Sequence, residues 1–262
     1  MWNNVDLLWQ AGIILSAICF LIQVMLFFLK PDTRKMDQKI LLQLSLARLI
    51  CTVSEFIAFE AKFVYNYNHI VLYVYVIRML WLYSDIVSVL WMAMYMKTLY
   101  EKFVQAVLLH DWTFRSMFLL VWLLSIPITI LMTIRFTVYH SYITFTNVAV
   151  PITYFMFKFI ILFANFSYFC KIFQVIIKKK MRTDCNIVDD NNVSSIVKVC
   201  IISFCLVSIT SLYILVDYIL VLACVLFPNI CNESMFLFNS ATSSYQGIII
   251  AAIFIILVKN SN

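Results

Sequence analysis

The chain has 262 residues, of which 64% are hydrophobic and 12% charged, and its formal net charge is +6. A soluble domain of this size needs far more polar surface, so the composition indicates an integral membrane protein. With 2 Gly and 4 Pro, the chain has too few turn residues for a β-barrel. We therefore predict an all-α bundle of membrane helices. The positive charge favours anionic inner-leaflet lipid as a partner and gives no reason to expect nucleic-acid binding.

Seven apolar stretches are each long enough to cross about 30 Å of hydrocarbon. We expect the spans at residues 8–29, 40–59, 70–100, 114–135, 148–177, 193–227 and 235–258. Residues 1–7 are expected to form a short extracellular segment and residues 259–262 a short cytoplasmic tail. Asp6 and no basic residue precede the first span, which favours a mature helix over a cleaved signal peptide. No linker or second domain is visible, so we predict one seven-helix domain.

Basic residues gather in the loops after the first, third and fifth predicted spans. Because positively charged loops stay in the cytoplasm, we expect the N-terminus outside and the C-terminus inside. On this topology Asn232-Glu233-Ser234 is the one outward-facing sequon, and Asn232 is the glycosylation candidate. The basic residues are Lys30, Arg34, Lys35, Lys39, Lys97, Lys102, Arg115, Lys178, Lys179, Lys180, Arg182 and Lys198.

Ionisable residues occur away from the ends of four predicted spans, where each is costly and indicates either a function or a pairing. Two of these spans carry a pair spaced seven apart, which places both members on one helix face. One interpretation is a polar cavity in the outer half of the bundle that contacts a charged ligand. The other, which the spacing alone favours, is a set of interhelical ion pairs that fix helix register. The residues are Arg48 and Glu55, Arg78 and Asp85, Lys158, and Asp217.

Sequence motifs for catalysis and cofactor binding are absent. The three histidines lie in different loops, and the chain has no nucleophile elbow, P-loop or dinucleotide fingerprint. The 8 cysteines show neither a disulfide framework nor metal-ligand spacing. We therefore predict that the protein is not an enzyme and needs no metal or cofactor.

The two glycines are Gly12 and Gly247. A glycine inside a membrane helix lowers helix propensity, and its usual reason in lipid is the close approach of a neighbouring helix. Gln246, beside Gly247, supplies an amide that can bond across such a contact.

Several motifs together resemble the secretin-like (class B) G protein-coupled receptors. Ser244-Tyr245-Gln246-Gly247-Ile248-Ile249-Ile250-Ala251 resembles the Ser-Phe-Gln-Gly-x-x-Val-Ala signature of the seventh helix in that family. Gly12-Ile13-Ile14-Leu15-Ser16 is similar to its first-helix Gly-x-x-x-Ser pattern. Further likenesses are carried by Asp32-Thr33-Arg34, Leu46-Ala47-Arg48, Trp91-Met92 with Leu99, and Asn165-Phe166 with the basic cluster that ends at Arg182.

The resemblance implies a divergent receptor that transmits a signal from an extracellular peptide or other ligand to a heterotrimeric G protein. Together with the placement of the ionisable and basic residues described above, it suggests three sets of site residues. The ligand-pocket candidates are Arg48, Glu55, Arg78, Asp85, Lys158 and Gln246; the G-protein-facing candidates are Arg34, Lys178, Lys180 and Arg182; and the helix-packing candidates are Gly12, Ser16, Trp91, Asn165 and Gly247.

The chain also departs from the family pattern. The positions of the cytoplasmic polar network hold Gln38, Tyr95, Cys200 and Phe254, and the sixth-helix kink lacks both Pro and Gly. A helix without these residues has no identifiable place to bend. Two alternatives therefore stay open. One is a chemosensory receptor or small channel that uses no G protein, and the other is a non-signalling decoy or dimer partner.

Overall fold

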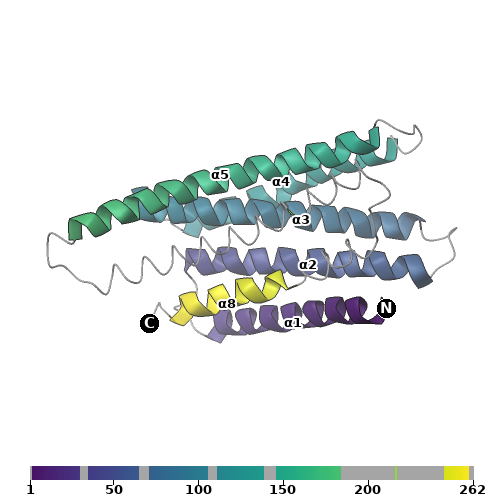
Figure 1. The fold of residues 1–262 in the computed structure, drawn as a ribbon, viewed down its shortest axis with the longest axis horizontal. Coiled ribbons are helices and arrows are strands. Elements are labelled where there is room, and N and C mark those ends of the chain that lie inside the picture. The colour runs from purple at the N-terminus through teal and green to yellow at the C-terminus, as the bar shows by residue number, and fades with distance from the viewer. Residues whose placement is uncertain are drawn as a thin grey trace.

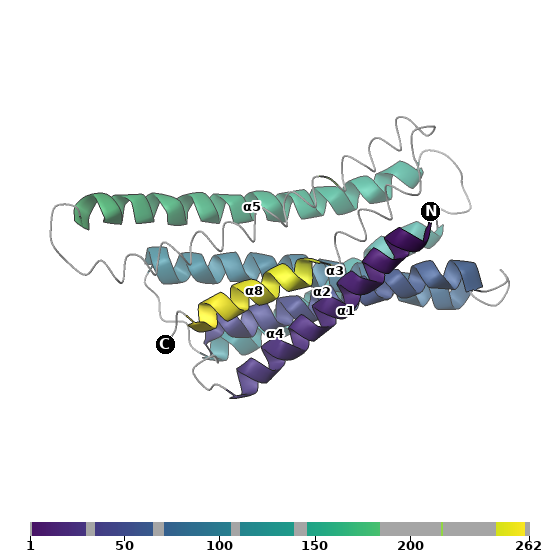
Figure 2. The ribbon, with the colours of Figure 1, turned by 60° about the horizontal axis from the view of Figure 1, so that its bottom comes forward.

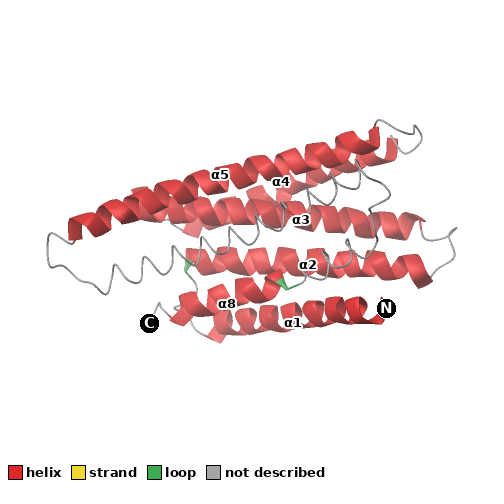
Figure 3. Cartoon of the chain, viewed as in Figure 1, coloured by secondary structure: helices red, strands yellow, loops and turns green. Residues whose placement is uncertain are grey.

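The computed structural model describes residues 2–29, 35–64, 71–105, 111–138, 146–183, 216 and 245–259. Within these residues every regular element is helical (Figure 3). The elements are α1 (Trp2–Leu29), α2 (Met36–Val64), α3 (Val71–Tyr100), the π-helical turn η2 (Glu101–Gln105), α4 (Asp111–Val138), α5 (Thr146–Thr183) and α8 (Gln246–Lys259). The predicted span at 193–227, apart from Val216, and residues 235–244 of the seventh predicted span lie outside the described residues.

Helices α1, α2, α4 and α5 begin earlier than the apolar stretches that predict them, and α2, α4, α5 and α8 end later. Helix α1 starts at Trp2, so residues 2–7 form its first turns. Helix α5 has 38 residues and continues to Thr183, which gives it a length of about 57 Å at 1.5 Å per residue. It therefore extends well beyond a hydrocarbon core of about 30 Å.

Five described helices are long and apolar enough to cross a membrane. The spans are Leu7–Leu29, Met36–Ile57, Met79–Tyr100, Phe114–Leu131 and Met156–Val175, and Gln246–Ile256 is a shorter apolar helix. Within the spans 50% of α2 and 56% of α3 is buried, against 17–22% of α1, α4 and α5. Large apolar side chains such as Leu21, Leu131 and Phe163 are exposed on these outer helices, as expected for a surface that faces lipid. The predicted all-helical membrane class is confirmed.

The helices alternate in direction. Helices α1, α3, α5 and α8 run one way and α2 and α4 the other (Figures 1 and 2). Helix α2 packs against α1, α8 and α3, and α3 also packs against α4 and α5. The core lies mainly along the α2–α3 contact and includes Leu41, Trp91, Tyr95, Val121 and Phe254. Helices α2 and α3 are therefore the centre of the bundle, and the other helices cover them.

One end of the bundle carries most of the described basic residues. The ends of α1, α3, α5 and α8 and the beginnings of α2 and α4 meet there, on the left in Figure 1. At this end Lys102 Nζ lies 2.8 Å from Asp37 Oδ2, and the ammonium group of Lys39 lies 5.7 Å from the centre of the Phe114 ring. The two termini lie toward opposite ends of the bundle (Figure 1). We expect the basic loops to lie in the cytoplasm. Their described lysines and arginines therefore lie toward the same end of the molecule.

Candidate functional site

Three charged side chains from three helices meet inside the bundle. Asp85 of α3 accepts a hydrogen bond at Oδ1 from Arg48 Nη1 of α2 at 3.2 Å. The other carboxylate oxygen, Oδ2, lies 2.7 Å from Nζ of Lys158 on α5. Each of the three side chains exposes 5–7% of its surface. A single carboxylate thus ties α2, α3 and α5 together, and we call these three residues the charge cluster.

Pairing within the charge cluster explains how three charged side chains can be buried in an apolar bundle. An unpaired charge at membrane depth is costly, and opposite charges in contact offset much of that cost. The buried thiol of Cys51, one turn from Arg48, lies within electrostatic range of the cluster and of Glu55. Glu55 is half-buried on the same face of α2. Glu55 lies about two helical turns from Arg48, and its charge acts on the same thiol as the charges of the cluster.

Of the remaining ligand-pocket candidates, Gln246 belongs to a fourth helix, α8, and the side chain of Arg78 is not described. Arg78 belongs to α3, but the position of its side chain lies outside the described part of the structure. Gln246 is the first residue of α8 and is buried, and its Nε2 has no hydrogen-bond partner among the described residues. Asp217 and the glycosylation candidate Asn232 lie outside the described residues.

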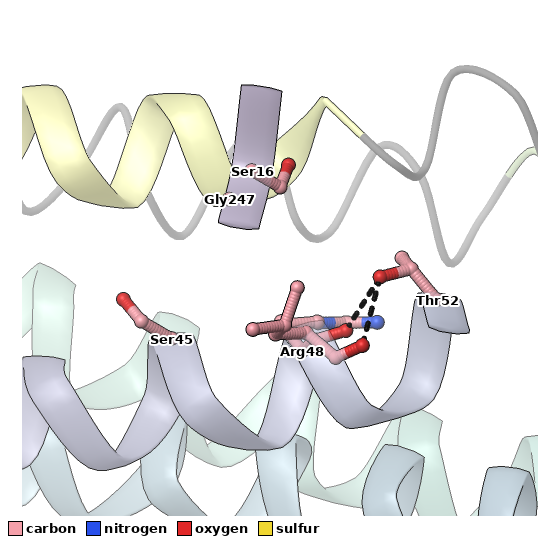
Figure 4. Close-up of a pocket in the computed structure, with 6 residues that line it drawn as sticks. Ser16, Ser45, Arg48, Thr52 and Gly247 are labelled. Atoms are coloured by element: carbon pink, nitrogen blue, oxygen red, sulfur yellow. Dashed lines mark hydrogen bonds between the residues drawn. The ribbon is translucent and has the colours of Figure 1, made fainter. Parts of the chain in front are cut away.

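Gly247 lies where α8 comes closest to α1. A Cβ atom added to Gly247 would lie 2.7 Å from both Cβ and Oγ of Ser16, and Figure 4 shows the two residues against each other. Gly12 is buried one turn before Ser16 on α1. Tyr245 strengthens the same contact by donating a hydrogen bond from its hydroxyl to the carbonyl oxygen of Leu8 at 3.1 Å. The missing side chain of Gly247 thus permits the close packing of the first and last described helices.

A small cavity lies between α1, α2 and α8. Its lining is formed by Ser16, Ser45, Arg48, Leu49, Thr52 and Gly247 (Figure 4). The Thr52 hydroxyl lies 3.1 Å from the carbonyl oxygens of both Arg48 and Leu49, so its proton is used within α2. The cavity has room for about one water molecule, far less than the 300–1,000 Å³ or so of a typical ligand pocket. This cavity therefore has no room for the side chain of a bound peptide.

The other predicted residues fall into two groups. Trp91 and Asn165 are fully buried; the Trp91 ring stacks on Phe114 with a centroid distance of 6.0 Å, and both amide atoms of Asn165 lack a partner among the described residues. Lys178 is exposed near the end of α5. Lys180 and Arg182 belong to the last turns of α5 without a described side chain, and Arg34 lies outside the described residues.

Among the buried polar residues that sequence reasoning missed, two have side-chain atoms without a hydrogen-bond partner among the described residues. Gln23 of α1 is 0% exposed and Ser45 of α2 is 3% exposed, and neither was singled out from the sequence. A signal was present for Gln23, because Trp9, Ser16 and Gln23 recur every seven residues and so share one face of α1. Ser45 carries no such signal, because a single serine in an apolar span usually bonds to its own helix.

No model of a known protein family matches this chain, and no curated protein matches it.

Proposed function

We propose that this chain is a seven-helix receptor of the plasma membrane that resembles the secretin-like G protein-coupled receptors. The observation that carries the proposal is the contact between Ser16 and Gly247. Ser16 ends the motif that resembles the first helix of the family, and Gly247 lies within the motif that resembles the seventh, near the other end of the chain. Two distant motifs that pack against each other act as one structural unit, which supports a shared architecture more than either motif does alone.

The directions of the helices support seven spans and an outer N-terminus. Helices α5 and α8 run in the same direction (Figures 1 and 2). In an alternating bundle, two parallel helices require an odd number of crossings between them, and the apolar stretch at 193–227 supplies one. The end that carries the basic residues belongs in the cytoplasm by the positive-inside rule. That assignment puts Met1 outside and the last residues of α8 inside.

The charge cluster lies in the half of the bundle that this orientation turns outward. Asp85 and Lys158 lie close to the beginnings of the spans Met79–Tyr100 and Met156–Val175, away from the basic end. We infer that a charged group of an extracellular ligand acts on this cluster. An acidic group competes with Asp85 for Arg48 and Lys158, and a basic group competes with them for Asp85. Either exchange changes how α5 is held against α2 and α3, which is a packing change of the kind that transmits signals.

Two measurements test the proposal. Epitope tags at each end should show an N-terminal tag accessible on intact cells and a C-terminal tag accessible only after permeabilisation. Guanine-nucleotide exchange should then be measured with the protein expressed beside each class of heterotrimeric G protein, and a rise above untransfected membranes is expected. A cytoplasmic N-terminal tag overturns the orientation. Correct topology with no exchange on any G protein overturns the signalling function and favours the decoy, while ionic current in bilayers that contain only this protein favours the channel.

A further inference from the structure

A row of buried polar side chains follows the contact between α1, α2 and α8. Ser16 of α1 and Ser45 of α2 line the same small cavity, and Gln246 lies beside Gly247 at the beginning of α8. Gln23 lies seven residues beyond Ser16 on the same face of α1, which is about 10 Å further toward the basic end. We call Gln23, Ser45 and Gln246, together with the cavity that Ser45 lines, the polar seam.

The polar seam contains hydrogen-bonding atoms that no described residue satisfies. Both Nε2 and Oε1 of Gln23, Oγ of Ser45 and Nε2 of Gln246 are buried without a partner. Buried polar atoms in native proteins are almost always bonded to protein or to ordered water, because an unmade bond is costly. At membrane depth bulk water cannot supply the missing bond. These four atoms therefore point to an occupant of the seam.

The chemistry of the atoms identifies the occupant. Gln23 presents a donor and an acceptor together, and the Ser45 hydroxyl can also act as both. A cation would satisfy only the oxygens and an anion only the N–H and O–H groups, whereas water both donates and accepts. The cavity beside Ser45 has room for about one water molecule. Size and bonding pattern therefore favour water over an ion.

We propose that the polar seam is an internal water-binding site in which ordered waters bridge α1, α2 and α8. Helix α8 then has two different attachments: a close contact with α1 at Gly247 and exchangeable water-mediated bonds at Gln246. Water bridges are nearly as favourable in enthalpy as direct hydrogen bonds. The proposal is independent of signalling, because it requires only the described helices to be packed as they are.

Radiolytic hydroxyl-radical footprinting of the full chain in lipid nanodiscs tests the proposal directly, because bound water generates radicals beside buried side chains. Leu49 lines the cavity, whereas Leu46, also half-buried on α2, does not. We expect Leu49 to be oxidised faster than Leu46, and faster than the intrinsically more reactive Met96 in the 0%-exposed core. Equal oxidation of Leu49 and Leu46 overturns a hydrated cavity.

A pair of matched variants tests the seam at Gln23. In Gln23→Leu the bridging waters lose their partner, so Tm should fall by about 2–4 °C. Gln10→Leu makes the same change on the exposed surface of α1 and should leave Tm unchanged or raise it. A rise in Tm for Gln23→Leu shows that the seam is dry, because removal of an unsatisfied amide then relieves its cost. A Tm that depends on exchanging sodium chloride for potassium gluconate at constant ionic strength identifies an ion instead of water, and also overturns the proposal.

Discussion

Removing the carboxylate of Asp85 should destabilise this protein more than any other single change in charge among the described residues. Asp85 is 3% exposed and is the shared partner of Arg48 and Lys158. The variant Asp85→Asn keeps the size of the side chain and removes only its charge. It leaves two buried cations close to each other without the carboxylate that separates them.

The expected loss of stability follows from the distances between Asp85 and its two partners. At an effective dielectric constant of about 20, opposite charges attract by about 6 kcal/mol at the 2.7 Å of the Lys158 pair and about 5 kcal/mol at the 3.2 Å of the Arg48 pair. Desolvation offsets much of this attraction, and breaking a buried pair costs about 3–5 kcal/mol in practice. Since 1 kcal/mol lowers Tm by about 2–4 °C in a chain of this size, we expect Asp85→Asn to lower Tm by about 10 °C.

The assay compares thermal unfolding of matched variants in the same detergent. Asp37→Asn is the control, because Asp37 also pairs with a lysine of another element, Lys102, at 2.8 Å. Here the Lys102 side chain is 49% exposed, and such pairs contribute about 1 kcal/mol or less. The two variants make the same chemical change, so the difference between their Tm values isolates the effect of burial.

A variant that replaces the whole charge cluster tests whether uncompensated charge causes the loss of stability. Apolar residues of similar volume in place of a complete buried ion network are often neutral or stabilising. The triple variant Arg48→Met, Asp85→Leu, Lys158→Met should therefore recover most of the Tm lost in Asp85→Asn. If Asp85→Asn and Asp37→Asn have equal Tm values, or if the triple variant is less stable than Asp85→Asn, then uncompensated charge is not the cause.

Three further predictions concern packing and can be measured by denaturant titration in detergent. Gly247→Ala should lower stability by about 1–3 kcal/mol, because the new Cβ would meet Ser16 at 2.7 Å, and adding Ser16→Gly should restore it; a fully stable single variant contradicts the close approach. Trp91→Ala removes a 0%-exposed ring and should cost about 3–5 kcal/mol. Phe118→Ala, at a position with 37% exposure, should cost less than half of that, and equal losses from the two variants contradict the assigned core. Tyr83→Phe loses a 3.0 Å hydrogen bond to a backbone carbonyl of α4 and should cost about 0.5–1.5 kcal/mol; an unchanged midpoint would show that this bond contributes nothing.

The membrane-helical class could be predicted because it depends on local composition. A continuous apolar run of about 20 residues is enough to indicate a membrane helix, as the stretch at 114–135 and helix α4 (Asp111–Val138) illustrate. The ends of the helices could not be predicted in the same way. Helix α1 includes Asp6 and begins at Trp2, because backbone hydrogen bonding can continue through polar residues where the apolar signal stops.

The partners of the buried charges could not be predicted from spacing. The sequence shows that Arg48 shares a helix face with Glu55, and Arg78 with Asp85, but it does not show which face meets which helix. In the structure Arg48 bonds Asp85, 37 positions away on another helix. The same limit explains why Gln23 and Ser45 were missed, since burial depends on what the neighbouring helices cover.

By itself the sequence determined that this protein is a bundle of membrane helices, that its basic residues gather in alternate loops, and that charges and two glycines lie inside the apolar spans. These properties follow from the residues taken one segment at a time. Only the tertiary structure decided that Asp85 pairs with both Arg48 and Lys158 and that Ser16 packs against Gly247. Such contacts depend on the rotation, depth and crossing of whole helices, and these arise from packing over many residues at once.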